Sequence, residues 1–234
     1  MKKLFLIAAM SVFISPASWA ADIDPTGLAQ TQFKDLSKEL GFGLSYFPMA
    51  PAEPLGILGF DIGVEATAVD INENKGFWSI MGDFPGMLPI PKLHVQKGLP
   101  FGIDLGAIYS QVPSTNISLW GGEVKWAFLK GGITMPAVAI RGTYTKLNGV
   151  DNLDLNTTGY DISISKGFLM FTPYAGVGQV IINSKPDVPG LDDETITETK
   201  YFAGLKTSLG LLNAVAEADF AEVPAYSLKL GLGF

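Results

Sequence analysis

The sequence predicts an all-β fold: an antiparallel up-and-down transmembrane β-barrel of ten to twelve strands, with a short amphipathic helix near the N-terminus. Three observations lead to this prediction. The chain is 47% hydrophobic and has 27 glycines, yet beyond residue 20 it has no apolar run of the roughly 20 residues that a membrane-spanning helix needs. Its apolar residues stand instead at every second position, in strand-length segments. Short and long connections alternate between these segments, as in a barrel with turns at one end and loops at the other.

The first residues predict an export signal. Residues 1–3 include two lysines, residues 4–14 are apolar, and a break at Pro16 is followed by the small residues Ser18 and Ala20. This order is typical of a secretory signal peptide, which is not part of the mature fold. We expect residues 1–20 to be removed and the mature chain to begin at residue 21.

Charge and cysteine content narrow the possible partners. Without the two signal lysines, the formal charge of −7 becomes −9, which makes a nucleic-acid partner unexpected. The chain has no cysteine, so it has neither a lipoprotein anchor nor a disulfide. We expect the fold to be stabilised by hydrogen bonds between its strands and by the solvent around it.

The last nine residues alternate strictly between apolar and other side chains. One face carries Tyr226, Leu228, Leu230, Leu232 and Phe234. A terminal strand that ends on an aromatic residue resembles the closing strand of the outer-membrane β-barrel proteins of Gram-negative bacteria. The resemblance implies a location in the outer membrane, with outer-membrane lipid and the insertion machinery as partners. It also implies that these five side chains form the assembly signal.

Residues 25–40 predict the helix, with Asp24 as its cap, Pro25 in its first turn and Gly41 at its end. We divide the mature chain into a helical lead-in over residues 21–41 and a barrel over residues 42–234. The sequence leaves open whether the helix lies in the periplasm or the lumen, and whether it is a passive lead-in or a gate or plug. Residues 42–47 alternate as a further short strand, which is why the count extends from ten to twelve.

Ten longer segments predict the barrel strands. Their connections are alternately short with glycine, as expected of periplasmic turns, and longer and polar, as expected of extracellular loops. The predicted strands cover residues 56–70, 89–97, 100–111, 115–129, 133–147, 155–166, 168–183, 196–208, 210–221 and 224–234.

The residues between the apolar ones should line the lumen, because the apolar face of a membrane barrel faces lipid. Their charges change sign from strand to strand, which predicts a packed ladder of ion pairs. Ile117 and Leu119 are out of phase with the outward residues of their strand, which predicts a bulge near Gly121 and Gly122. The predicted lumen network is Lys92, His94, Asp104, Glu123, Lys125, Arg141, Asp161, Lys200, Lys206, Glu217, Asp219 and Lys229.

No catalytic, cofactor or metal site is predicted. Outer-membrane phospholipase and lipid A deacylase would need a His-x-Ser pair, whereas this chain has His94 followed two residues later by Gln96. Omptin-like proteases use a histidine at the extracellular rim, while His94 stands near the turn at Gly98. The acidic loop over residues 187–198 lacks the alternating spacing of a calcium loop. We therefore expect that the protein is not an enzyme, and that His94 is a hydrogen-bonded lumen residue.

Two function classes remain. One is a narrow or gated channel or transporter for small or hydrophobic molecules, with its substrate unknown. The alternative is a structural or adhesive outer-membrane barrel without transport activity. A soluble β-sandwich or lipocalin is a third possibility for the fold, but its loops would not sort by length at the two ends.

Overall fold

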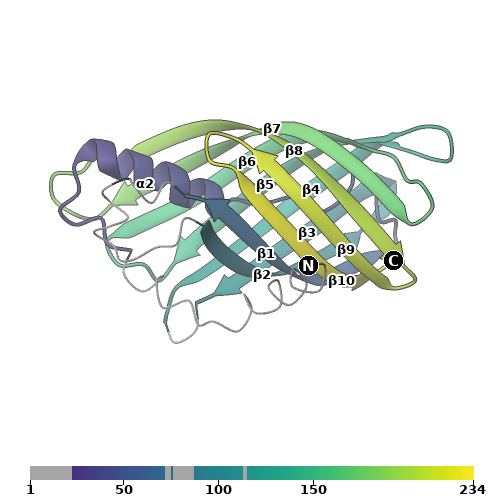
Figure 1. The fold of residues 1–234 in the computed structure, drawn as a ribbon, viewed down its shortest axis with the longest axis horizontal. Coiled ribbons are helices and arrows are strands. Elements are labelled where there is room, and N and C mark those ends of the chain that lie inside the picture. The colour runs from purple at the N-terminus through teal and green to yellow at the C-terminus, as the bar shows by residue number, and fades with distance from the viewer. Residues whose placement is uncertain (1–22, 72–74, 76–86, 113–114) are drawn as a thin grey trace, which may run out of the picture.

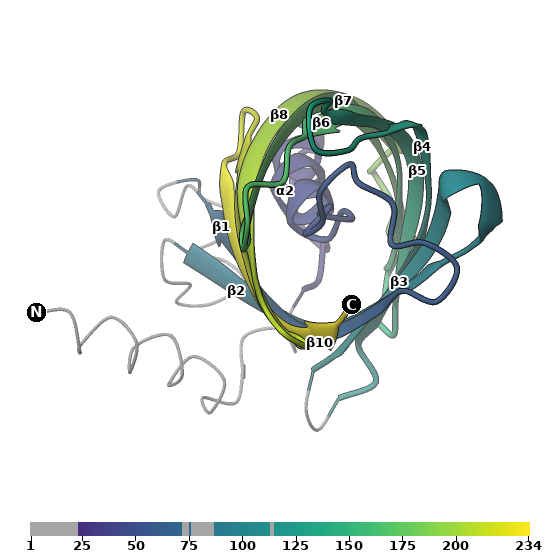
Figure 2. The ribbon, with the colours of Figure 1, turned by 90° about the vertical axis from the view of Figure 1, so that its right-hand side faces the viewer.

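The computed structural model describes residues 23–71, 75, 87–112 and 115–234 and forms a closed antiparallel barrel of ten strands (Figures 1 and 2). Each strand pairs with its neighbours in sequence, and the last strand pairs with the first. This confirms the predicted fold class. The signal peptide over residues 1–20 lies outside the described residues. The strands are β1 (Phe60–Asp70), β2 (Met87–Gly98), β3 (Ile103–Gln111), β4 (Ser118–Lys130), β5 (Ala137–Asn148), β6 (Leu153–Ser165), β7 (Phe171–Pro186), β8 (Glu194–Leu209), β9 (Leu212–Phe220) and β10 (Ala225–Gly233), with helix α2 (Gln30–Gly43) before them and the short 3-10 helix η2 (Pro100–Gly102) between β2 and β3.

The two ends of the barrel differ in their connections. We name the end with the connections 99–102, 131–136, 166–170 and 210–211 the turn end, and the opposite end the loop end. Gly131 and Gly210 have positive φ angles of 75° and 63°, which residues with a Cβ atom rarely adopt. The contrast in length is weaker than predicted, because the connections 149–152 and 221–224 at the loop end are also short.

The strands present an apolar outer face, as β6 illustrates. Tyr160, Ile162 and Ile164 are exposed on the outside, and Asp161 and Ser163 are buried between them. Successive side chains of a strand point to opposite faces, so this alternation places an apolar surface toward lipid.

The lumen is occupied by the chain that precedes β1. Figure 2 shows α2 inside the ring of strands, and its first residue, Gln30, bonds to Glu194 and to the carbonyl oxygen of Asp192 at the loop end. Residues 44–59, which we name the plug segment, then cross the lumen to the turn end. There, the amide of Leu55 bonds to Asp104 at the start of β3.

The short strand predicted over residues 42–47 is wrong. Phe42 and Gly43 close α2, and Tyr46 and Phe47 belong to no strand or helix. Every residue from 39 to 52 is buried, so the alternation of apolar and small residues does not mark one buried and one exposed face. The segment does not cross the bilayer as a wall strand, which leaves the count at ten.

The predicted start and end of the helix also need correction. Asp24 accepts hydrogen bonds from the amide and hydroxyl of Thr26, at 3.0 and 2.6 Å, and so caps a turn that precedes the helix. Gly27 has a φ of 83°, which is not a helical angle, so this turn does not continue into α2. Gly41 does not end α2, which continues to Gly43. A Cβ atom on Gly41 would clash with the side chain of Ile182 on β7, so the glycine allows the helix to approach the wall closely.

The bulge predicted near Gly121 and Gly122 is wrong as well. The register between β4 and β5 is continuous from Ser118 to Trp126 and shifts only between Trp126 and Leu129. Ile117 and Leu119 point inward, with 8% and 3% of their surface exposed. They do so because the lumen is apolar at the loop end, where α2 fills it.

Candidate functional site in the barrel lumen

The lumen has an apolar layer at the loop end. Phe33, Leu36 and Leu40 of α2 are almost completely buried against inward side chains of the wall. Burial of this extent stabilises the position of a helix through the hydrophobic effect. The wall residues in this layer include Val69, Ile71, Ile90, Ile108, Ile117, Leu119, Leu147, Leu153, Leu155, Val180, Ile182 and Ile196.

Between this layer and the turn end the inner wall is charged. Its charged groups bind the backbone of the plug segment. Lys125 donates to the carbonyl oxygens of Pro51 and Glu53, at 2.8 and 3.1 Å. The same lysine pairs with Asp104 at 3.0 Å, and Asp104 accepts the amide of Leu55 at 3.1 and 3.2 Å. This satisfies main-chain groups that would otherwise be buried without partners.

A second set of contacts holds the upper part of the plug segment. Lys200 donates to the carbonyl oxygen of Tyr46 at 3.4 Å, and Glu217 accepts the amide of Met49 at 3.1 Å. Glu217 also accepts the hydroxyl of Tyr174 at 2.6 Å. The wall therefore offers both donors and acceptors to the main chain of the plug segment.

Phe47 lies between two wall lysines. Its ring centroid is 4.5 Å from the ammonium of Lys92 and 5.1 Å from that of Lys200. A desolvated ammonium over an aromatic face is stabilised by the ring quadrupole. The Phe47 ring thus adds two cation–π contacts that hold the plug segment against the wall.

His94 joins the wall to the plug segment. Its Nδ1 lies 2.8 Å from the carboxylate of Glu65, and its Nε2 lies 2.9 Å from the hydroxyl of Tyr46. Lys92 also pairs with Glu65, at 3.2 Å. The order of carboxylate, imidazole and hydroxyl resembles a catalytic relay, but all three groups are at most 2% exposed, so the arrangement positions Tyr46 in the lumen.

Arg141 binds carboxylates on both neighbouring strands. Its guanidinium lies 3.1 Å from Glu123 of β4 and 3.6 Å from Asp161 of β6. Gln96 of β2 donates to the other carboxylate oxygen of Glu123 at 2.6 Å. These contacts tie four strands together in an interior where an unpaired charge would be costly.

The remaining residues of the predicted lumen set form two groups. Lys206 and Lys229 both bind Asp61, at 3.1 and 3.0 Å, and Lys200 binds Asp219 at 3.2 Å. All residues of the predicted network are buried in the lumen except Lys206, which is partly exposed.

Asp61, Glu65 and Tyr46 also belong to the lumen network, although the sequence did not predict them. The two acids alternate with the outward residues Ile62 and Val64 on β1, so the rule used for the other strands could have found them. No comparable signal marks Tyr46, because the alternation over residues 42–47 is the same as that of a wall strand.

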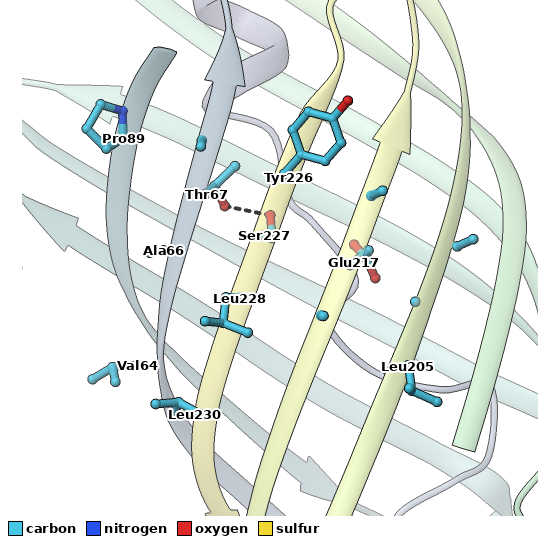
Figure 3. Close-up of a pocket in the computed structure, with 15 residues that line it drawn as sticks. Val64, Ala66, Thr67, Pro89, Leu205, Glu217, Tyr226, Ser227, Leu228 and Leu230 are labelled. Carbon is cyan, nitrogen blue, oxygen red and sulfur yellow. Dashed lines mark hydrogen bonds between the residues drawn. The ribbon is translucent and has the colours of Figure 1, made fainter. Parts of the chain in front are cut away.

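The terminal strand closes the barrel against β1. Phe234 and Phe60 exchange backbone hydrogen bonds of 3.0 and 3.1 Å, and their rings meet edge to face at 5.0 Å. Figure 3 shows the outer face of this seam, with Leu228 and Leu230 beside Val64. The five residues of the predicted assembly signal are all exposed on this outer face.

A shallow groove of about 710 Å³ crosses the outside of the seam from β8 to β2 (Figure 3). It exists because the outward residues there are small, as Ala66, Ala68, Ala216 and Ala218 show. Its lining is predominantly apolar, and Pro89 of β2 lies at its edge.

Ion pairs outside the membrane-spanning strands also hold α2. Lys38 lies 2.7 Å from Glu222 in the connection between β9 and β10, and Lys75 lies 2.9 Å from Glu39. The hydrogen bond between the first pair raises the pKa of Lys38 and lowers the pKa of Glu222. Because the Glu222 side chain is 61% exposed, this pair contributes little to stability.

Within the described part of the chain, no group of three or more histidine or acidic side chains is arranged to hold a metal ion. Across the same residues, no helix is long and apolar enough to cross a bilayer.

Neither a protein-family model nor a curated protein sequence matches the chain. Among solved structures, it is similar to Neisserial surface protein A at 10% identity, with a TM-score of 0.34, over 74% of this chain and 95% of that protein. It is also similar to Ail, the attachment invasion locus protein of Yersinia pestis, solved in complex with the heparin analogue sucrose octasulfate. That match has 13% identity and a TM-score of 0.30, over 75% of this chain and 95% of that protein. Similarities of this size carry no argument about function. The chain's own strand pairing shows a closed ten-strand barrel, and the outward side chains of its strands are largely apolar.

Proposed function

We propose that the protein is an outer-membrane barrel with a gated lumen, acting as a narrow channel or transporter for small or hydrophobic molecules. The observation that carries this proposal is the set of bonds from wall charges to the backbone of the plug segment, led by those of Lys125 and Asp104. In this proposal the signal peptide is removed after residue 20, and the turn end faces the periplasm.

The nature of these bonds favours a movable plug. A lysine ammonium or a carboxylate that binds main-chain groups can exchange them for water when the segment leaves, whereas a packed side-chain core has no such substitute. A barrel of ten strands is also wider than the eight-stranded barrels that side chains alone can fill. Removal of the segment would leave a bore lined by charges of both signs.

The structural or adhesive alternative is supported by the apolar layer. Phe33 and Leu36 of α2 are fully buried, and a helix held in this way can serve as a permanent core for a barrel that transports nothing. A functional measurement must separate the two classes.

Conductance in planar bilayers makes this separation. We expect the wild-type protein to show no large steady current, because the plug segment and α2 occupy the lumen. A variant in which residues 30–55 are replaced by a glycine and serine sequence of equal length should conduct. The control replaces the exposed connection 131–136 between β4 and β5 in the same way and should stay closed.

Two outcomes of this experiment would contradict the proposal. A wide, constitutive current through the wild-type protein would show that the lumen is open. A replacement variant that folds, as judged by its heat-modifiable gel migration, but stays silent would favour the structural or adhesive class.

Phe234 is the residue on which the proposed assembly signal depends most. Phe234→Asp should lower the amount of folded protein in the outer membrane and increase degradation, because a charge would replace the ring that packs on Phe60 at the seam. The measurement is the folded fraction in membrane preparations, with Phe220→Asp at the loop end as the control. Equal assembly of Phe234→Asp and wild type would refute the role of this residue.

A further inference from the structure

The wall between β2 and β3 is only partly paired. Strand β2 pairs with β1 along its whole length, from Met87 opposite Asp70 to Lys97 opposite Phe60. Its pairing with β3 begins only at Leu93, opposite Tyr109. Within the described residues, the loop-end half of β2 therefore has no partner on its β3 side.

Two prolines occupy this unpaired edge. The amide of Gly98 donates to Gly59 on the β1 side, and successive residues of a strand direct their main-chain groups to opposite sides. Pro89 and Pro91 lie an odd number of residues from Gly98, so their main chain faces β3. Neither has an N–H group to donate. An unpaired amide in hydrocarbon costs several kcal/mol, and the prolines remove this cost at both positions, as is typical of edge strands.

The interior behind this edge is apolar. Ile90 of β2 and Ile108 of β3 point inward, are 6% and 3% exposed, and belong to the cluster formed with α2. The helix approaches the wall closely here, since a Cβ atom on Gly43 would lie 2.9 Å from Val69 and 3.5 Å from Ile90. The next inward residue of β2 toward the turn end is Lys92, where the charged part of the lumen begins.

The outer face of the same region is suited to hydrocarbon. Leu93 and Tyr109 are each 47% exposed on the outside of the barrel. The shallow apolar groove across the seam ends at Pro89. An extended apolar chain that lies against the barrel in this groove would reach the unpaired edge.

We propose that the loop-end half of the β2–β3 boundary is a lateral portal, through which an acyl chain passes from the surrounding leaflet to the apolar layer around α2. This proposal rests on the proposed transport function and deepens it, since it names the substrate class as single hydrocarbon chains and the route as lateral. The chain comes from a free fatty acid or from a membrane phospholipid, which share this chemistry.

Photolabelling in proteoliposomes tests the portal. One arm uses a fatty acid with a diazirine on its chain, and the other uses a phospholipid with the same chain. After illumination, the labelled residues are identified by mass spectrometry. We expect label on the inward residues Ile90 and Ile108 as well as on the outward residues Leu93 and Tyr109. Label from either arm supports the portal, and the comparison identifies the source of the chain.

Two variants sharpen the test. Replacing both Pro89 and Pro91 with valine restores two donors on the side that faces β3, which should lower inward labelling about tenfold. The matched control, Pro173→Val on the paired strand β7, should leave it unchanged. Ile108→Trp, which places a larger side chain behind the edge, should abolish labelling at Ile90 and leave Leu93 labelled.

Wild-type protein labelled only at Leu93 and Tyr109 would overturn the proposal, as would inward labelling that is unaffected by both the proline and the tryptophan variants. Folding of each variant is checked by heat-modifiable migration. The conductance experiment contains no acyl-chain probe, so a failed portal and a failed axial channel are distinguishable.

Discussion

Replacing Arg141 with methionine is expected to destabilise the folded barrel by about 3–5 kcal/mol, the usual cost of breaking a buried ion pair on one side. The Arg141 side chain has no exposed surface and serves both Glu123 and Asp161. Its removal would leave two carboxylates in an enclosed lumen without their cation. The measurement is the urea midpoint of unfolding in lipid vesicles.

Two controls accompany this experiment. One breaks an exposed ion pair, and the other removes the charges of the two partner carboxylates. Lys146→Met on the same strand breaks an exposed pair with Asp154 and should cost less than about 1 kcal/mol. Combining Arg141→Met with Glu123→Gln and Asp161→Asn should recover most of the loss. An unchanged midpoint for Arg141→Met would mean that the three groups are not enclosed together.

A charge on the lipid-facing side of β8 should have the second largest effect. Leu205 is 42% exposed and points outward in the apolar band, so Leu205→Arg should cost about 2–4 kcal/mol. Thr197→Arg, which points outward on the same strand nearer the loop end, should be tolerated. The two variants are compared by folded yield and by urea midpoint. Equal costs at the two positions would contradict a lipid-facing position for Leu205 and a position of Thr197 beyond the apolar band.

The ten wall strands and their two faces could be predicted because most of these strands follow a single periodicity, whereas the count of up to twelve included a strand that does not form. On β9 and β10 the inward acids and lysines alternate with outward apolar residues, and nothing else in the local sequence competes with that pattern. The up-and-down order also predicts which strands are neighbours. The register between neighbouring strands could not be predicted, and therefore neither could the exact partner of each charge, because the offset depends on contacts that form only in the folded barrel.

The contents of the lumen were beyond prediction for a different reason. Tyr46 and Phe47 are enclosed on all sides by strands far away in sequence, so their own alternation carries no information about a face. The same holds for Leu119, because its apolar side chain belongs to the apolar layer around α2 and does not face lipid. The edge at Pro89 and Pro91 emerges only when the register with β3 is known.

Cross-linking between the plug segment and the wall tests the occupied lumen most directly. Ala52 and Ala139 of β5 are both completely buried in one cluster, and the natural chain has no cysteine to interfere. In the folded protein, the Ala52→Cys, Ala139→Cys variant should oxidise to an internal disulfide that is visible on non-reducing denaturing gels. The pair Ala52→Cys, Ala175→Cys, whose second member points outward, should not. Absence of the first cross-link in a folded barrel would contradict a plug segment that runs through the lumen.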